Sequence, residues 1–511
     1  MSSVTDPADW IECAARSHPD RLFLAAPLGR RYDYAALRGE SGRVAAALRG
    51  LGVRAGDRVA VRVEKSAEAV LLYVACLRLG AAFVPVNVAC SPNEVEYFLR
   101  DSKPRVAVVA PADLAVLESV AKQSAVEHLL TLGVDGDGSL MELARRRDAI
   151  SEPERNVGPD SLAAIVYTSG TTGRSKGAML TRANLASNAS VLAESWRFTG
   201  EDVLLHVLPL FHVHGLFAAI NTVLASGSGM VLMPKFDAAA AVAHLAGVTV
   251  FMGVPTHYTR LLQEPGLDRT TTAGMRLFVS GSAPLLAETH QEFARRTGHQ
   301  ILERYGMTET LMNTSNPYDG ARVPASVGPP LPGVAVRVIN AETGVVETAP
   351  ETIGTLEIKG PNVFAGYWQD EEKTRSEFTA DGWFKTGDLG RIDRNGYVYI
   401  VGRVKDLVIS GGYNVYPKEV ESELDAIPGV AESAVFGVPH PDFGEGVTAA
   451  VVLKAGANLS EANILDAVRS RLARYKLPKR ILLVAELPRN TMGKVQKNVL
   501  RSTNASLYAT D

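Results

Sequence analysis

The sequence predicts an α/β protein with a large N-terminal domain, in which partly parallel sheets are flanked by helices, followed by a β-subdomain and a small, mobile α+β C-terminal domain. Short β-rich apolar runs alternate with helical patterns through most of the 511 residues, which is typical of parallel sheets with crossover helices. The pattern changes after about residue 330, where closely spaced strands begin, and again near residue 405, where helices return.

The elements of the first part follow from their apolar periodicity. Leu37, Val44, Leu48 and Leu51 recur at helical spacing before Gly52, which predicts a helix that ends there. The other elements that the pattern predicts in this part are strands over residues 58–63, 105–110, 248–252 and 277–279, and a helix over 66–79.

The second part begins at a Gly/Pro cluster over residues 328–333. Strand-sized runs over 335–339 and 354–359 follow it and predict an antiparallel β-subdomain. The pattern after residue 405 predicts helices over 417–427 and 461–472 and strands over 430–438 and 448–453. We therefore predict two domains, residues 1–404 and 405–511, the second of ordinary small-domain size.

Composition excludes several classes of protein. The 53 Lys and Arg nearly balance the 56 Asp and Glu, so the net charge of −3 gives no reason to expect nucleic acid or an anionic membrane as a partner. Residues 203–234 carry no Asp, Glu, Lys or Arg, but Pro209, His212 and His214 make a membrane-spanning helix a poor interpretation. Three cysteines without metal-binding spacing, and an N-terminus without a signal or transit pattern, predict a cytoplasmic protein. The oligomeric state stays open.

The segment with the clearest chemistry is LAAIVYTSGTTGRSKGAML, residues 162–180. An apolar strand runs into a loop that offers backbone N–H groups, hydroxyls and two cations without bulky side chains, which suits an anion such as phosphate. The loop is not a Walker A motif, because Ser175 precedes Lys176 and Gly177 follows it. The alternative interpretation is a flexible surface loop.

YTSGTTGRSKG resembles the phosphate-binding loop of the acyl-adenylate-forming superfamily, which includes acyl-CoA synthetases, peptide-synthetase adenylation domains and firefly-type luciferases. Further segments resemble its other motifs in order, so the resemblance covers essentially the whole chain: SGSAPL at Ser280, ERYGMTE at Glu303, WFKTGD at Trp383, GRVKDLVISGGYNVYP at Gly402 and PRNTMGKVQK at Pro488. It implies an enzyme that activates an acid as its adenylate with ATP and Mg²⁺ and then transfers the acyl group to CoA.

The resemblance assigns the phosphate contacts first. The loop residues that would hold the β- and γ-phosphates are Thr168, Ser169, Gly170, Thr171, Thr172, Gly173 and Lys176. Thr308 would contact phosphate, while Glu309, with Thr171, would hold Mg²⁺, a hard cation suited to carboxylate and phosphate oxygens. A Thr-Glu pair alone is more often a helix cap.

The resemblance also assigns the nucleoside contacts. Asp388 would accept the ribose hydroxyls, a role that suits an acceptor-only carboxylate, and Arg403 would be the second ribose contact. An isolated Asp after Gly is otherwise usually a turn residue. The residues implied to contact adenine and its surroundings are Ser282, Ala283, Pro284, Glu303, Tyr305 and Gly306.

Lys494 matches the family lysine that bridges the carboxylate and phosphate oxygens during adenylation, a task that suits a mobile point charge. Lys405 matches the hinge about which the small domain rotates between the two half-reactions. Rotation would bring Gly411, Gly412 and Tyr413 to the pantetheine tunnel of CoA.

The segment LPLFHVHGLF contains residues that the resemblance places near the acid substrate. His212 matches the residue that gates the acyl tunnel and takes part in catalysis, and His214 one that lines the acyl pocket. A hydrogen-bonded structural histidine is the alternative for each, and His-x-His without a third ligand does not indicate a metal. The other residues that the resemblance places at the acyl group are Ser280, Gly281 and Met312.

Arg304 bears most directly on the identity of the acid. The matching residue in acyl- and aryl-CoA ligases is usually small, and an arginine there would block a fatty or aromatic tail and would be costly to bury without an anion. We infer a second carboxylate on the substrate, held by the guanidinium fork. The alternative is an Arg304 paired with Glu303 or another acid outside the pocket.

ERYGMTETLMNTSNPYDG and its flanking segments resemble the malonyl-CoA synthetases. The expected reaction is malonate + ATP + CoA → malonyl-CoA + AMP + pyrophosphate, with methylmalonate as a possible second substrate. The alternatives are an oxalyl- or short- or medium-chain acyl-CoA ligase, an adenylation enzyme that loads a carrier protein in trans, and a catalytically inactive binding protein.

Overall fold

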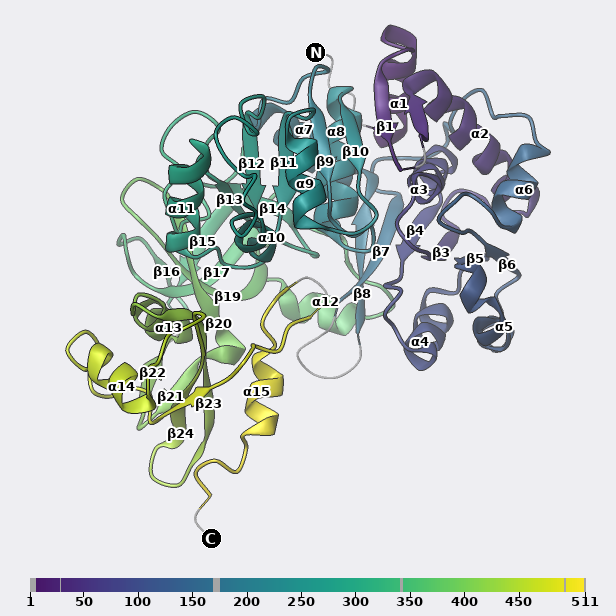
Figure 1. Cartoon of the computed structure of the whole chain (residues 1–511). Coiled ribbons are helices and arrows are strands. Elements are labelled where there is room, and N and C mark those ends of the chain that lie inside the picture. The colour runs from purple at the N-terminus through teal and green to yellow at the C-terminus, as the bar shows by residue number, and fades with distance from the viewer. Residues whose placement is uncertain (1–5, 28, 169–174, 341–342, 491–492, 510–511) are drawn as a thin grey trace. The chain divides into compact units, whose positions relative to one another are not determined.

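A computed structural model describes residues 6–27, 29–168, 175–340, 343–490 and 493–509 of the chain (Figure 1). The chain divides into two compact units, the first formed by Met1–Ala335 with Ile358–Phe384 and the second by Val336–Glu357 with Lys385–Asp511. The predicted α/β class is confirmed. This division does not locate a hinge, so the domain boundary between residues 404 and 405 stays a prediction.

The first unit contains a sheet of seven strands in the order β18-β8-β7-β4-β3-β5-β6. The four strands from β4 to β6 run parallel, and β4 is also parallel to β7, whereas β8 pairs antiparallel with both β7 and β18. The strand bounds are β3 (Arg58–Arg62), β4 (Ala82–Pro85), β5 (Val106–Val109), β6 (His128–Thr131), β7 (Leu162–Thr168), β8 (Lys176–Thr181) and β18 (Gly366–Tyr367).

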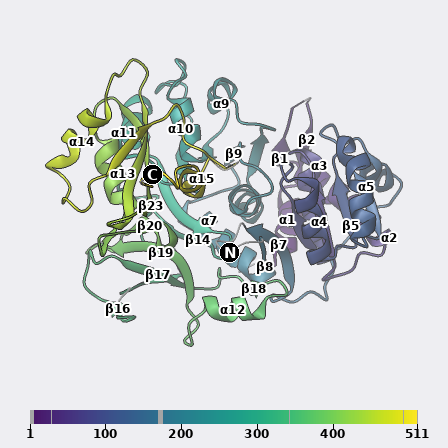
Figure 2. The same ribbon diagram turned by 90° about the horizontal axis from the view of Figure 1, so that it is seen from below.

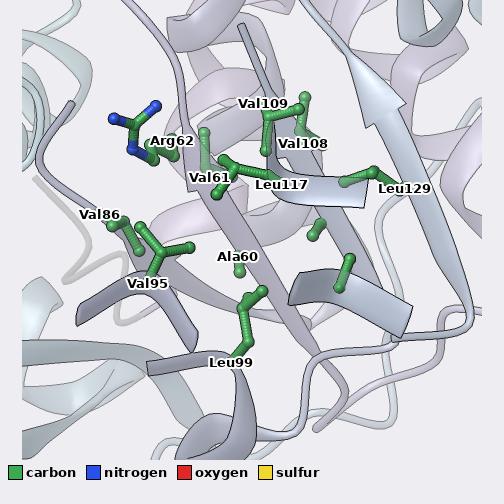
Figure 3. Close-up of a pocket in the computed structure, with 12 residues that line it drawn as sticks. Ala60, Val61, Arg62, Val86, Val95, Leu99, Val108, Val109, Leu117 and Leu129 are labelled. Carbon is green, nitrogen blue, oxygen red and sulfur yellow. The ribbon is translucent and has the colours of Figure 1, made fainter. Parts of the chain in front are cut away.

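Two helices, α4 (Pro92–Ser102) and α5 (Leu114–Gln123), cover one face of this sheet and lie beside β5 in both ribbon views (Figure 2). Figure 3 shows aliphatic side chains from these helices and strands, including Val95, Leu99 and Leu117, gathered around a gap in the core. This cavity has a volume of about 10 Å³, which is too small for a substrate. It belongs to the packed interior.

The helix α3 (Ala67–Leu79) is buried along its whole length. It starts where the sequence predicts: the Ser66 hydroxyl accepts a hydrogen bond from the Ala69 N–H at 3.1 Å, and Gly80 ends the helix in the left-handed conformation. The Tyr73 ring on this helix contacts both Phe83 of β4 and Phe217 of η2 (His214–Ile220). This helix therefore packs between the seven-stranded sheet and the helices of the next sheet.

The second sheet of the first unit has eight strands in the order β14-β13-β12-β11-β9-β10-β1-β2. The strands from β13 to β1 are parallel, so their carboxyl ends lie at one edge. The bounds are β1 (Leu22–Ala25), β2 (Arg31–Asp33), β9 (Val203–His206), β10 (Gly229–Leu232), β11 (Val250–Gly253), β12 (Leu277–Ser280), β13 (Leu302–Met307) and β14 (Leu311–Ser315).

The uncharged segment over residues 203–234 forms β9, the π-helix η2 (His214–Ile220), the helix α8 (Asn221–Ser226) and β10, as buried parts of this unit. A π-helical turn is rare and is frequently found at functional sites. Within the described part of the chain, no helix has both the length and the apolar character needed to cross a bilayer.

The second unit contains two further sheets. One has the order β16-β15-β17-β19-β20, and its strands are β15 (Ala335–Ile339), β16 (Val346–Glu347), β17 (Gly354–Lys359), β19 (Phe384–Ile392) and β20 (Val398–Arg403). The other contains β21 (Val408–Ser410), β22 (Tyr413–Val415), β23 (Val430–His440), β24 (Gly444–Leu453) and β25 (Arg480–Leu483). The helices α13 (Pro417–Asp425) and α14 (Glu461–Arg469) pack on this second sheet.

Candidate active site

The predicted phosphate loop lies between two paired strands. Thr168 at the end of β7 and Lys176 at the start of β8 are directly opposite each other in the antiparallel pair. The strand predicted before the loop is therefore present. Five of the loop residues predicted to bind phosphate, Ser169, Gly170, Thr171, Thr172 and Gly173, lie outside the described residues.

Glu309 lies in the turn after β13, next to the half-buried Thr308, and is 7% exposed. The Tyr367 hydroxyl donates a hydrogen bond of 3.0 Å to its carboxylate. The Lys176 ammonium lies 5.5 Å from the centroid of the same tyrosine ring, at cation–π distance. The structure thus brings the predicted phosphate-binding lysine and the predicted magnesium ligand together around one aromatic side chain.

Sequence reasoning missed Tyr367. It lies in β18, which joins the sheet by pairing with β8, so Tyr367 is opposite Ala178. Burial and the Glu309 carboxylate raise the pKa of this tyrosine, so its hydroxyl stays protonated and donates. Only the pairing of two strands far apart in the sequence reveals this contact.

The surroundings of Glu309 fit a magnesium ion that is held mainly by its nucleotide. Among the described residues, no three side chains of the His, Cys, Asp or Glu type converge on one point. Mg²⁺ in nucleotide sites typically has one or two carboxylate ligands, with phosphate oxygens and water completing its octahedron. A single buried carboxylate near a phosphate loop satisfies that requirement.

Arg304 is buried in β13, with 3% of its surface exposed. Its Nη2 lies 3.5 Å from the Ser282 hydroxyl, and its Nε has no hydrogen-bond partner. In the part of the chain that the structure describes, no carboxylate forms an ion pair with this guanidinium, which removes the alternative of a pairing with Glu303. Burial lowers the pKa of Arg304 to about 9.

Two backbone features lie next to this arginine. A Cβ atom at Gly281 would lie 2.4 Å from Arg304 Cζ, so a larger residue there would displace the guanidinium from its present position. Ser282 has a φ of +70°, a conformation rare for residues other than glycine and frequent at functional sites. Arg276, by contrast, donates to both carboxylate oxygens of Asp202, at 2.6 and 2.8 Å, and is not available to a substrate.

His214 is fully buried at the first position of η2. Its Nδ1 lies 3.3 Å from the Ser282 hydroxyl, and its backbone N–H donates to His212 Nδ1 at 3.3 Å. Burial and the positive charge of Arg304 lower the pKa of His214 well below its usual range, so the ring is neutral. The two predicted acyl-site histidines thus contact each other, and His214 also contacts Ser282.

The other predicted residues of the first unit lie close by in the fold. Ser280 ends β12, where its neighbour across the parallel pair is Glu303 of β13. Tyr305 and Gly306 continue β13, and Met312 is buried in β14. Ala283 is half-buried and Pro284 exposed in the loop after β12.

In the second unit, Asp388 and Arg403 are opposite each other in the β19–β20 pair, and Arg403 Nε lies 3.0 Å from an Asp388 carboxylate oxygen. Lys494 lies in a loop closed by two 3.0 Å hydrogen bonds with Asn490. Partial burial and then the charge of Arg403 lower the pKa of Lys494 to about 8, while Asp388 acts in the opposite direction. The predicted ribose contacts and the predicted catalytic lysine are therefore electrostatic neighbours within one unit.

The predicted hinge and CoA residues lie on the surface of this unit. Lys405 is exposed in the 3₁₀ turn η3 (Val404–Asp406). Gly411 and Gly412 have φ angles of +59° and +81°, as a tight turn between β21 and β22 requires. Tyr413 is 59% exposed and stacks on Tyr475 with ring centroids 4.8 Å apart.

Comparison with known proteins identifies the family. The profile of the AMP-binding enzymes matches residues 11–368, and that of the AMP-binding enzyme C-terminal domain matches residues 419–494. The chain therefore belongs to the AMP-binding enzyme family.

Particular relatives are similar over nearly the whole chain. The crystal structure of ATP-bound MatB from Rhodopseudomonas palustris is 53% identical, with a TM-score of 0.94 over 98% of this chain and 99% of that chain. The mitochondrial malonate–CoA ligase of Mus musculus is 38% identical over 88% of this chain and 82% of its own length. A sulfoacetate–CoA ligase of Cupriavidus necator is 34% identical over 97% and 99%.

Proposed function

We propose that the protein is an AMP-forming acid–CoA ligase that converts malonate, ATP and CoA into malonyl-CoA, AMP and pyrophosphate through a malonyl adenylate. The observation that carries the choice of acid is Arg304, a buried cation without an ion-pair partner among the described residues. An unpaired guanidinium in the interior is costly, and a carboxylate on the substrate would offset that cost. The relatives named malonate–CoA ligases support the same choice.

In the first half-reaction, one carboxylate of malonate attacks the α-phosphorus of ATP and pyrophosphate leaves. Negative charge on the phosphates is stabilised by fixed donors and cations, a role we assign to Lys176 and the backbone of its loop. Glu309 would hold Mg²⁺, which supplies further charge neutralisation when bound. Lys494 would bridge the attacking carboxylate and the phosphate oxygens.

In the second half-reaction, the CoA thiol displaces AMP from the acyl carbon. The distal carboxylate stays on Arg304 throughout, so the reacting carbon keeps its position between the two steps. Neutral His214 and the Ser282 hydroxyl would orient the substrate without adding charge. We propose that the small domain rotates about Lys405 between the half-reactions. This rotation would withdraw Lys494 and bring Gly411, Gly412 and Tyr413 to the pantetheine tunnel.

The guanidinium of Arg304 also suits a sulfonate, which offers similar acceptor oxygens. Sulfoacetate is therefore our second candidate substrate, favoured by the relative that matches this chain over nearly its full length.

We propose that the protein is located in the cytoplasm, which is supported by three cysteines that are all free thiols.

A CoA-dependent AMP-release assay over acetate, oxalate, malonate, methylmalonate, succinate, sulfoacetate and octanoate tests the function. We expect the highest kcat/KM for malonate. A preference for acetate or octanoate would contradict the dicarboxylate assignment. AMP release with a carrier protein but not with CoA would instead support an enzyme that loads a carrier in trans.

Tyr367→Phe should raise the Mg²⁺ concentration needed for ATP binding by about tenfold, because the variant loses the hydrogen bond that orients Glu309 but keeps the ring beneath Lys176. Calorimetric titration of ATP at a series of Mg²⁺ concentrations measures this shift. Tyr399→Phe removes a hydroxyl in the second unit and is the matched control. Identical Mg²⁺ dependence in Tyr367→Phe and wild type would remove Tyr367 from this role.

Lys405→Pro should permit adenylation while blocking transfer to CoA, because proline fixes φ near −65° and restricts the proposed rotation. Lys405 lies in the first turn of η3, where its backbone N–H has no acceptor within the turn, so proline removes no hydrogen bond of η3 and the turn is expected to fold. Pyrophosphate exchange and thioester formation from supplied malonyl adenylate measure the two halves separately. Equal losses in both would show that Lys405 is not the hinge.

A further inference from the structure

Lys65 is a buried lysine that the proposed mechanism leaves unused. It follows β3 and directly precedes the Ser66 cap of α3, and only 8% of its surface is exposed. Its Nζ donates a 2.8 Å hydrogen bond to the backbone oxygen of His206. No ion pair involves Lys65 in the part of the chain that the structure describes, and burial lowers its pKa well below the usual range. Such a residue costs stability, which points to a functional reason for its presence.

His206 links this lysine to the acid site. Its Nε2 lies 2.9 Å from the Gly215 carbonyl oxygen and must carry the proton, so the ring is a neutral donor there. Gly215 fixes the turn, because a Cβ atom at this position would lie 2.1 Å from the Pro209 oxygen. His214, the preceding residue, faces Ser282, whose hydroxyl also lies within reach of Arg304.

The sheet brings further basic side chains to the same edge. The strands β13, β12, β11 and β9 are parallel neighbours, and their pairing relates the position of Glu303 to that of His206. Glu303 is opposite Ser280, Ser280 is opposite Gly253, and the preceding residue, Met252, is opposite His206. His257, in the helix α10 (Pro255–Leu261) after β11, has its pKa lowered to about 3 by burial, then by Arg260 and by Lys65. Ligands of α/β proteins bind at such carboxyl ends.

This edge therefore concentrates basic side chains beside the buried carboxylate of Glu303. Its members are Lys65, His206, His214, His257 and Arg304. None of the five forms an ion pair with an Asp or Glu among the residues described. Arg304 and Lys65 each disfavour positive charge on a neighbouring histidine. The histidines are neutral, so the positive charge at this edge comes from Arg304 and Lys65, and it attracts a dianion more strongly than a monoanion.

We propose that Lys65 is a charge-selecting and positioning residue of the acid site, which acts through His206 to favour substrates with two negative charges over those with one. Its hydrogen bond fixes the end of β9, on which the turn at Gly215 depends. A bound anion favours the protonated form of Lys65, whose ammonium then adds positive potential to the pocket of Arg304. This role rests on the proposed function. In this role, Lys65 makes the enzyme prefer dianionic acids and does not contact ATP.

Lys65→Met should lower kcat/KM for malonate by about tenfold or more, mainly through KM, because the field that attracts the dianion weakens. The kcat/KM for butyrate and the KM for ATP should change by less than about threefold. The melting temperature should stay the same or rise, because an unpaired buried cation is removed. A purely structural role predicts the opposite pattern: lower stability and an equal loss for both acids.

Lys65→Gln separates charge from hydrogen bonding, because its amide still donates to the His206 oxygen. We expect it to lose malonate selectivity as Lys65→Met does. Lys359→Met is the matched control, since Lys359 Nζ also donates to a backbone oxygen at 2.8 Å, but at an exposed position. Wild-type selectivity in Lys65→Gln, or equal losses for malonate and butyrate in Lys65→Met, would overturn the proposal. A wild-type enzyme that does not use malonate would instead contradict the proposed function.

Discussion

Arg304→Gly should lower kcat/KM for malonate by about 30- to 5,000-fold. The variant loses a charge-assisted pair that contributes roughly 2–5 kcal/mol in a desolvated site, at about 1.4 kcal/mol per tenfold. Activity with butyrate should rise relative to malonate, because the change opens space beside Gly281 and removes a buried cation. The KM for ATP should move little, since we assign the nucleotide to other residues.

Steady-state kinetics with malonate and butyrate on folded variants measure this change. Arg304→Lys is the matched control and should recover only part of the loss, because an ammonium cannot reproduce the bidentate fork. An unchanged malonate-to-butyrate preference in Arg304→Gly would mean that another residue binds the distal carboxylate. His214 is then the next candidate, because Arg276 is already engaged by Asp202.

Lys494→Ala should abolish adenylation, with a loss of at least about a hundredfold, but leave thioester formation from supplied malonyl adenylate largely intact. The reason is the division of labour that we propose, in which this lysine serves only the first half-reaction. ATP–pyrophosphate exchange measures the first half, and CoA thioester formation from the adenylate measures the second.

Lys454→Ala, which removes an exposed lysine of the same unit, should leave both half-reactions of that assay unchanged. Loss of both half-reactions in a folded Lys494→Ala protein would contradict the proposed division. So would retention of adenylation in that variant.

Much of the fold was predictable because its signals are local. The helix α3 has a serine cap, a continuous apolar run and a terminal glycine within one segment, and its predicted and observed ends agree within one residue. The strands β15 and β17 have the predicted bounds. The burial of Arg304 also followed from its position next to a recognisable motif.

The contacts that complete the site were not predictable, because they join segments far apart in the sequence. Tyr367 reaches Glu309 only because β18 pairs with β8, and Lys65 reaches His206 across two different sheets. Neither residue belongs to a motif that the sequence marks. The π-helical turn at His214 likewise has no clear sequence signal, since its apolar run fits an α-helix equally well.

The central claim is that the distal carboxylate of the substrate is bound through its charge. The most direct test compares malonate with malonamate in the CoA-dependent AMP-release assay. Malonamate keeps the reacting carboxylate and nearly the same shape but replaces the distal carboxylate by a neutral amide. We predict that wild-type kcat/KM is at least about thirtyfold lower for malonamate, and that Arg304→Gly largely removes this difference. Equal use of the two acids by the wild-type enzyme would contradict the claim.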